Sequence, residues 1–103
     1  MKAVKVQYSV QAGYAENNSE NIKRVMEDLR QLNSADIKYS SFLLDDKKTF
    51  VHFAMFKSTE AEARFSKLDS FKKFQISLAA SNPEVLPKVE NLSLIGSSYE
   101  LFV

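Results

Sequence analysis

The order in which hydrophobic periodicity changes along the chain restricts its fold more than any other feature. Residues 3–11, AVKVQYSVQ, alternate apolar and polar side chains, as a strand does. Residues 19–33 then repeat apolar side chains every three to four positions, which indicates an amphipathic helix. Residues 36–44 and 49–56 are rich in aromatic and β-branched side chains and flank the charged turn DDKK, which predicts a β-hairpin.

Two capping patterns predict where the helices begin. Asn17 precedes Glu20 by three residues, an arrangement similar to a capping box for the first helix. Thr59 and Glu62 repeat the spacing and predict the start of a second helix. We expect a bend near residues 69–70, because Asp and Ser side chains compete for backbone hydrogen bonds.

The last quarter of the chain predicts a loop followed by a strand. Residues 81–89 contain both prolines of the chain, which favours a loop, and residues 91–103 read as the last strand. The resulting order is β-α-β-β-α-β. With right-handed crossovers it predicts an α+β, ferredoxin-like domain, with a four-stranded antiparallel sheet and both helices on one face. A chain of 103 residues has room for one such domain, spanning residues 1–103.

The amino-acid composition of the chain limits the classes of partner that it could bind. The apolar share of 45% and charged share of 26% are those of a globular protein, and a net charge of +1 would not steer a polyanion. No run of residues approaches the roughly 20 apolar positions of a membrane span. There is no cysteine, which fits a reducing compartment. We therefore expect a cytoplasmic protein that binds neither nucleic acid nor membrane.

The third predicted strand, residues 49–56, is apolar on both of its faces, although helices cover only one face of such a sheet. The uncovered side would expose a patch larger than most monomers carry. A second copy, related by a twofold axis, would cover it. We therefore expect a homodimer that forms through the sheet face remote from the helices; the alternative is a monomer with an apolar sheet surface.

Residues 54–78 resemble the dimeric α/β-barrel proteins, in particular the antibiotic-biosynthesis-monooxygenase-like family and its haem-degrading relatives. The strand that ends at Phe56, the Lys57-Ser58 turn, the helix start and the spacing of Phe65 and Phe71 carry the resemblance. It implies a dimeric barrel. For the function it implies a cofactor-independent oxygenase or isomerase acting on a small aromatic or carbonyl substrate.

The sequence departs from the site residues that this resemblance implies. Haem-degrading relatives use an Asn on the first strand, a Trp on the second helix and a His ten residues later. Those positions here are Gln7, Phe65 and Gln75. An amide is a poor axial ligand for haem iron, so we expect no bound haem and no other cofactor. Relatives that oxidise quinol-type substrates often carry a His in place of Phe65.

The candidate site residues are those that could line a cavity between the sheet and the second helix. His52 is the only histidine; it could serve as a general base or be a packed strand residue, and alone it makes a zinc site improbable. Gln7 and Ser9 would face the cavity, or else the dimer interface or water. We expect Phe65 and Phe71 to face the sheet, with Phe71 fully buried. The candidates are Gln7, Ser9, His52, Phe65, Phe71 and Gln75, with no metal site.

Two functions therefore remain open from the sequence. The first is the cofactor-independent enzyme that the resemblance implies. The second is a non-catalytic homodimer that binds a small ligand or has a structural role, which the missing family residues favour. Whether the protein is an enzyme is not decided at this level.

Overall fold

The computed structural model describes residues 1–102 and confirms the predicted α+β, ferredoxin-like architecture. A short 3-10 helix at Ala12–Tyr14 leads into the first helix. The elements in chain order are β1 (Lys2–Ser9), α1 (Ala15–Leu32), β2 (Ile37–Leu43), β3 (Thr49–Phe56), α2 (Thr59–Ser66), α3 (Asp69–Ala80) and β4 (Val85–Leu92).

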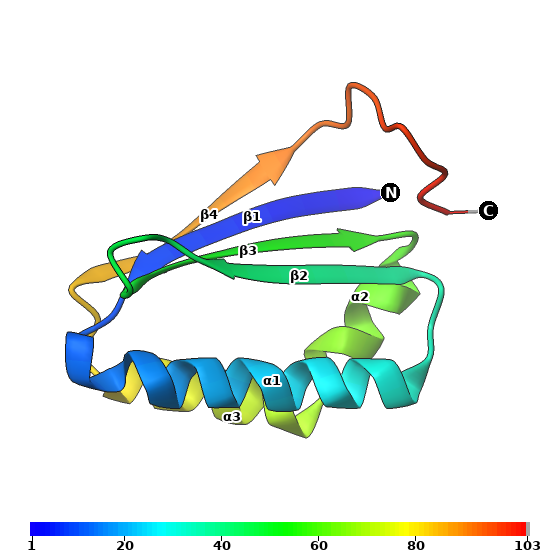
Figure 1. The fold of residues 1–103 in the computed structure, drawn as a ribbon. Coiled ribbons are helices and arrows are strands. Elements are labelled where there is room, and N and C mark those ends of the chain that lie inside the picture. The colour runs from blue at the N-terminus through cyan, green and yellow to red at the C-terminus, as the bar shows by residue number, and fades with distance from the viewer. Residues whose placement is uncertain (103) are drawn as a thin grey trace.

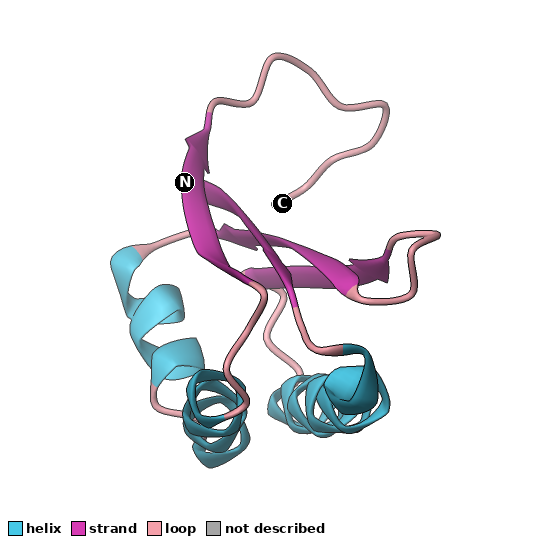
Figure 2. Ribbon diagram, turned by 90° about the vertical axis from the view of Figure 1, so that its left-hand side faces the viewer, coloured by secondary structure: helices cyan, strands magenta, loops and turns pink. Residues whose placement is uncertain are grey.

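The four strands form one antiparallel sheet in the order β2-β3-β1-β4, so β1 and β3 are central (Figure 1). The three helices lie on one side of this sheet, and the chain beyond β4 curls over its other side (Figure 2). In the described part of the chain, none of the helices combines the length and the apolar character required to cross a lipid bilayer.

The observed helix starts differ from the capping patterns, by three residues for α1 and by one residue for α2. Helix α1 begins at Ala15, after a 3-10 helix that already supplies the first turn, so Asn17 and Glu20 lie inside the helix. Helix α2 is capped by Ser58, whose hydroxyl accepts a hydrogen bond from the Ala61 backbone amide at 3.2 Å. Thr59 is therefore its first helical residue. The capping predictions were wrong in position, although helices form where expected.

The expected bend in the second helix is a complete break. The chain leaves helical geometry at Lys67–Leu68, where Leu68 is extended with φ −61° and ψ 128°. Asp69 then begins α3, where its negative carboxylate interacts favourably with the positive end of the helix dipole. The break lies just before residues 69–70, and it turns α3 onto α1 while α2 packs on β2 and β3. Phe65 and Phe71 meet across it, with ring centroids 4.3 Å apart.

The last strand lies earlier in the sequence than predicted. Residues Val85–Leu92 form β4, whereas residues 93–102 of the predicted strand lie beyond it without regular structure, and residue 103 lies outside the described residues. Pro87 is accommodated because β4 is an edge strand that pairs only with β1. The register shifts beside it: Gln7 pairs with Lys88 and Ser9 with Val85, so β4 carries one extra residue, a bulge.

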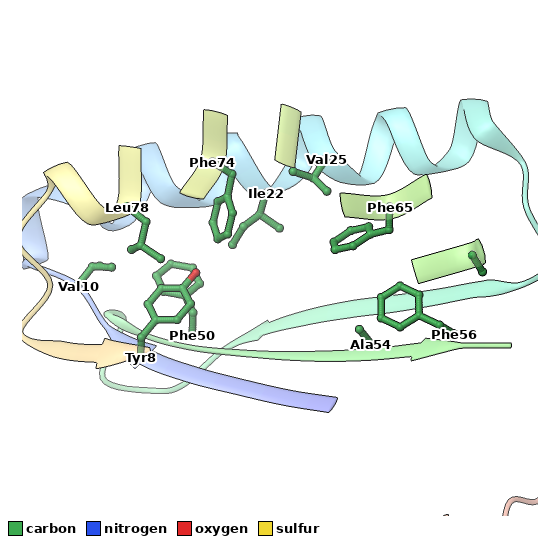
Figure 3. Close-up of a cluster of buried hydrophobic side chains, with 11 residues drawn as sticks. Tyr8, Val10, Ile22, Val25, Phe50, Ala54, Phe56, Phe65, Phe74 and Leu78 are labelled. Atoms are coloured by element: carbon green, nitrogen blue, oxygen red, sulfur yellow. The ribbon is translucent and has the colours of Figure 1, made fainter. Parts of the chain in front are cut away.

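The hydrophobic core lies between the sheet and the helices. Tyr8 and Phe50 point from the strands toward Phe74 and Leu78 of α3, and Phe65 points from α2 toward Phe56 (Figure 3). Helix α1 contributes Ile22 and Val25. Strand β4 contributes no buried residue, so the core is thinnest at that edge of the sheet.

Candidate functional site

A cavity of about 480 Å³ lies between the sheet and the α2–α3 pair. Its walls are mainly aromatic and aliphatic and include Phe65, Phe71, Phe74 and Leu78. The polar groups on its sheet side are Tyr8, Tyr39 and His52. Near its rim, Lys2 Nζ lies 2.7 Å from a Glu62 carboxylate oxygen, so these two charges neutralise each other. The cavity therefore suits a small and largely apolar molecule that offers a hydrogen-bonding group.

His52 is the centre of a buried hydrogen-bond network. Its Nε2 lies 2.8 Å from the Tyr8 hydroxyl, and its Nδ1 lies 2.6 Å from Ser41 Oγ and 3.1 Å from the Tyr39 hydroxyl. The Tyr8 hydroxyl in turn accepts a hydrogen bond from Asn18 Nδ2 at 2.8 Å. Four of the five side chains come from three neighbouring strands, and Asn18 comes from α1.

Strand register explains how these side chains meet. Ser41 is the Cα partner of His52 on β2, so both side chains point to the same face. Tyr8 pairs with Phe50, two residues before His52, and is therefore its diagonal neighbour on β1. The Tyr8 and His52 rings stack at 5.4 Å. The sheet thus fixes the orientation of the imidazole from both sides.

Burial controls protonation in this network. The His52 side chain is 3% exposed, and burial lowers the pKa of His52 from 6.5 to about 4. Burial also raises the pKa of Tyr8 far above its ordinary value, although the hydrogen bond from Asn18 acts in the opposite direction. Burial raises the pKa of Tyr39 as well. All three groups are therefore neutral near pH 7.

Gln7 and Ser9 lie outside the cavity, which corrects their inclusion among the candidates. Side chains alternate along β1, and because Tyr8 faces the helices, its neighbours face the other side of the sheet. There Ser9 Oγ lies 2.7 Å from Thr49 Oγ1. The structure therefore places Gln7 and Ser9 on the sheet face remote from the helices and not in the cavity.

The other four candidates, His52, Phe65, Phe71 and Gln75, all line the cavity. Phe65 is 5% exposed and packs between Tyr39 and Phe56. Phe71 is only half-buried, so the expectation that it is fully buried was wrong. After the break before α3, the Phe71 ring lies against Phe65, with centroids 4.3 Å apart, and 6.2 Å from the Phe74 ring, and it remains partly exposed.

The residues present do not fit a haem group. At the position where the sequence resemblance implies an iron ligand, Gln75 offers an amide, which is a poor ligand for haem iron. Both nitrogens of His52 are already engaged by hydroxyl groups. Within residues 1–102, no three His, Cys, Asp or Glu side chains gather in a way that could hold a metal ion.

The sequence patterns did not single out Asn18 and Ser41. Register could have revealed Ser41, because a hairpin around DDKK pairs residues 41 and 52. Asn18 gave no such signal, since its contact with Tyr8 depends on how α1 sits on the sheet. It is fully buried, and its Oδ1 has no hydrogen-bond partner.

No protein-family model matches the sequence, and no curated protein sequence matches it significantly. Solved structures do match closely. An antibiotic biosynthesis monooxygenase has a TM-score of 0.76 at 14% identity, with 93% of this chain and all of that chain covered. A Nitrosomonas europaea protein assigned to the same group has a TM-score of 0.78 at 15% identity, with the same coverage.

A variant of SnoaB, a cofactor-independent oxygenase from Streptomyces nogalater, has a TM-score of 0.71 at 12% identity. The match covers 96% of this chain and 97% of that chain. At such low identity these similarities establish architecture only. The chain therefore has the fold of the solved antibiotic biosynthesis monooxygenases, which confirms at the level of fold the resemblance seen in its sequence.

Proposed function

We propose that the protein is a cofactor-independent oxygenase or isomerase that removes a proton from a small aromatic or carbonyl substrate. The observation that carries the proposal is the contact between the Tyr8 hydroxyl and His52 Nε2, 2.8 Å, at the wall of an aromatic cavity. The similarity to SnoaB and to antibiotic biosynthesis monooxygenases supports this class of reaction.

The geometry favours a planar and neutral substrate. Phe65, Phe71 and Phe74 supply ring faces for stacking, and the Lys2–Glu62 ion pair leaves no unpaired charge to hold a carboxylate. A substrate hydroxyl or enol that reaches Tyr8 would place its proton next to the network. Its removal leaves an electron-rich anion, which can react with dioxygen or be reprotonated at another carbon.

Turnover should depend on His52. We expect one or more members of a panel of quinols, naphthols and 1,3-dicarbonyl compounds to consume dioxygen or to exchange carbon-bound protons in D₂O. His52→Gln should lower either rate by about 10²–10⁴-fold. An oxygen electrode and proton NMR measure the two outcomes separately.

Lys72→Ala, at an exposed position on α3, is the matched control and should retain full activity. Binding of these compounds, seen as shifted aromatic signals, without either reaction would contradict catalysis. It would support the second function, a non-catalytic protein that binds a small ligand.

We also propose that the protein is a homodimer formed through the sheet face remote from the helices. Phe42 and Phe53 contact each other on that face and are 57% and 38% exposed. Met55 of β3 and Leu92 of β4 extend the same apolar surface. A stable interface there should bury more than about 1,000 Å².

Sedimentation equilibrium at micromolar concentration should give twice the chain mass, and Phe53→Glu should reduce it to one chain mass. Ile76→Glu is a matched control, because Ile76 is 70% exposed on α3 and lies away from the sheet. A monomeric wild-type protein, or a Phe53→Glu variant that remains dimeric, would contradict the proposed interface.

A further inference from the structure

The two nitrogens of His52 contact hydroxyl groups in different surroundings. Nε2 meets the hydroxyl of Tyr8, which lines the cavity. Nδ1 lies 3.1 Å from the hydroxyl of Tyr39, which also lines the cavity, and 2.6 Å from Ser41 Oγ. Ser41 is a half-buried residue of the edge strand β2 that does not line the cavity. The imidazole therefore bridges the interior of the protein and the margin of the sheet.

The hydrogen bonds also indicate which nitrogen carries the proton. Asn18 Nδ2 donates to the Tyr8 oxygen, so the phenolic proton of Tyr8 is directed to its other partner, His52 Nε2. A neutral imidazole that accepts at Nε2 carries its proton on Nδ1. That proton is then donated to Ser41 Oγ, which is closer than the Tyr39 hydroxyl.

We infer that His52 is a neutral proton relay and that Ser41 connects it to solvent. A proton arriving from the cavity bonds to the Tyr8 oxygen as the phenolic proton of Tyr8 passes to Nε2. At the same time the Nδ1 proton passes to Ser41 Oγ, and the hydroxyl proton of Ser41 passes to water. One proton enters and one leaves, and the imidazole changes from the Nδ1–H to the Nε2–H tautomer.

The reverse sequence returns a proton to the cavity and restores the first tautomer. In this scheme the buried ring never carries a net charge, which its surroundings would disfavour. The idea that a substrate in the cavity supplies the proton depends on the proposed function. The connection between His52 and solvent through Ser41 does not, so it can be tested without a substrate.

Because His52 is the only histidine, ¹⁵N labelling of histidine reports on this one ring. We expect ¹⁵N chemical shifts of the Nδ1–H tautomer at pH 7. We expect the Nδ1 proton to exchange with water, measured by saturation transfer, about tenfold or more slowly in Ser41→Ala than in the wild type. Ser41→Thr keeps a hydroxyl at this position and should restore the rate.

Ser40→Ala is the matched control, since it removes a hydroxyl from the next position of β2, whose side chain faces the other side of the sheet, and it should leave the exchange rate unchanged. Amide spectra establish that each variant is folded. Equal or faster exchange in Ser41→Ala, or a dominant Nε2–H tautomer in the wild type, would overturn the relay. Absence of enzymatic turnover together with the expected exchange would refute the proposed function alone.

Discussion

Replacing Phe65 with alanine should lower the free energy of unfolding by about 3–5 kcal/mol. The Phe65 ring is 5% exposed and has three aromatic neighbours: Tyr39 at 5.0 Å, Phe56 at 5.5 Å and Phe71 at 4.3 Å between ring centroids. Its loss would remove these contacts and enlarge the cavity into the core. Urea denaturation followed by circular dichroism measures the loss.

Phe71→Ala provides the comparison, because the two rings touch and line the same cavity. Phe71 is half-buried, so its truncation opens space that is already connected to solvent. We expect a loss of roughly 1–2 kcal/mol, according to the smaller apolar area removed from water. A loss at Phe71 equal to or larger than that at Phe65 would show that α3 packs differently on the sheet.

Acidification should destabilise the fold by about 3 kcal/mol between pH 6.5 and pH 4 through His52 alone. The pKa of His52 falls from 6.5 to about 4 because the folded protein buries the imidazole. Between these two values the unfolded chain binds a proton that the folded chain does not, so stability decreases as the pH falls. Above pH 6.5 and below pH 4 the contribution of His52 is constant.

The groups that face His52 are Tyr8, Tyr39, Ser41 and Phe74, which carry no charge in this pH range. Hydrogen bonds from Thr49 and the Lys48 amide lower the pKa of Asp46, so that carboxylate titrates below the same window. His52→Gln should therefore lack the His52 contribution and lose less stability than the wild type between pH 6.5 and pH 4. The same slope in this variant and in the wild type would contradict the assignment to His52.

The hairpin could be predicted from the sequence almost residue by residue. Residues 36–44 and 49–56 were expected, and β2 and β3 span Ile37–Leu43 and Thr49–Phe56. Both signals are local, because aromatic alternation and a charged turn each act within a few residues. The Asp46 side chain accepts from the Lys48 and Thr49 amides and closes that turn.

Strand β4 could not be located in the same way. Its sequence contains Pro87 and alternates poorly, because neither of its faces is buried. Tertiary pairing with β1 decides that Val85–Leu92, and not the more apolar residues after it, enter the sheet. An alternation of apolar and polar residues arises when one face of a strand is buried. Because β4 is exposed on both faces, its sequence shows no such alternation.

The candidate site was predicted only in part for a related reason. His52 was singled out as the only imidazole, but its partners come from β1 and β2 and are distant in sequence. Strand alternation places Tyr8 on the helix side once one strand face is known to be buried. The same rule removes Gln7 and Ser9 from the site. Only the docking of α1 reveals Asn18.

The proline and the bulge in β4 also limit how copies of the protein can join. Pro87 has no backbone N–H, and the extra residue beside it bends the outer margin of the sheet. A strand from another molecule that paired with the edge of β4 would meet a bent strand that lacks one backbone hydrogen-bond donor, the N–H absent from Pro87. Growth of a continuous sheet from molecule to molecule is therefore blocked on this side, which protects a concentrated solution against fibrous aggregation.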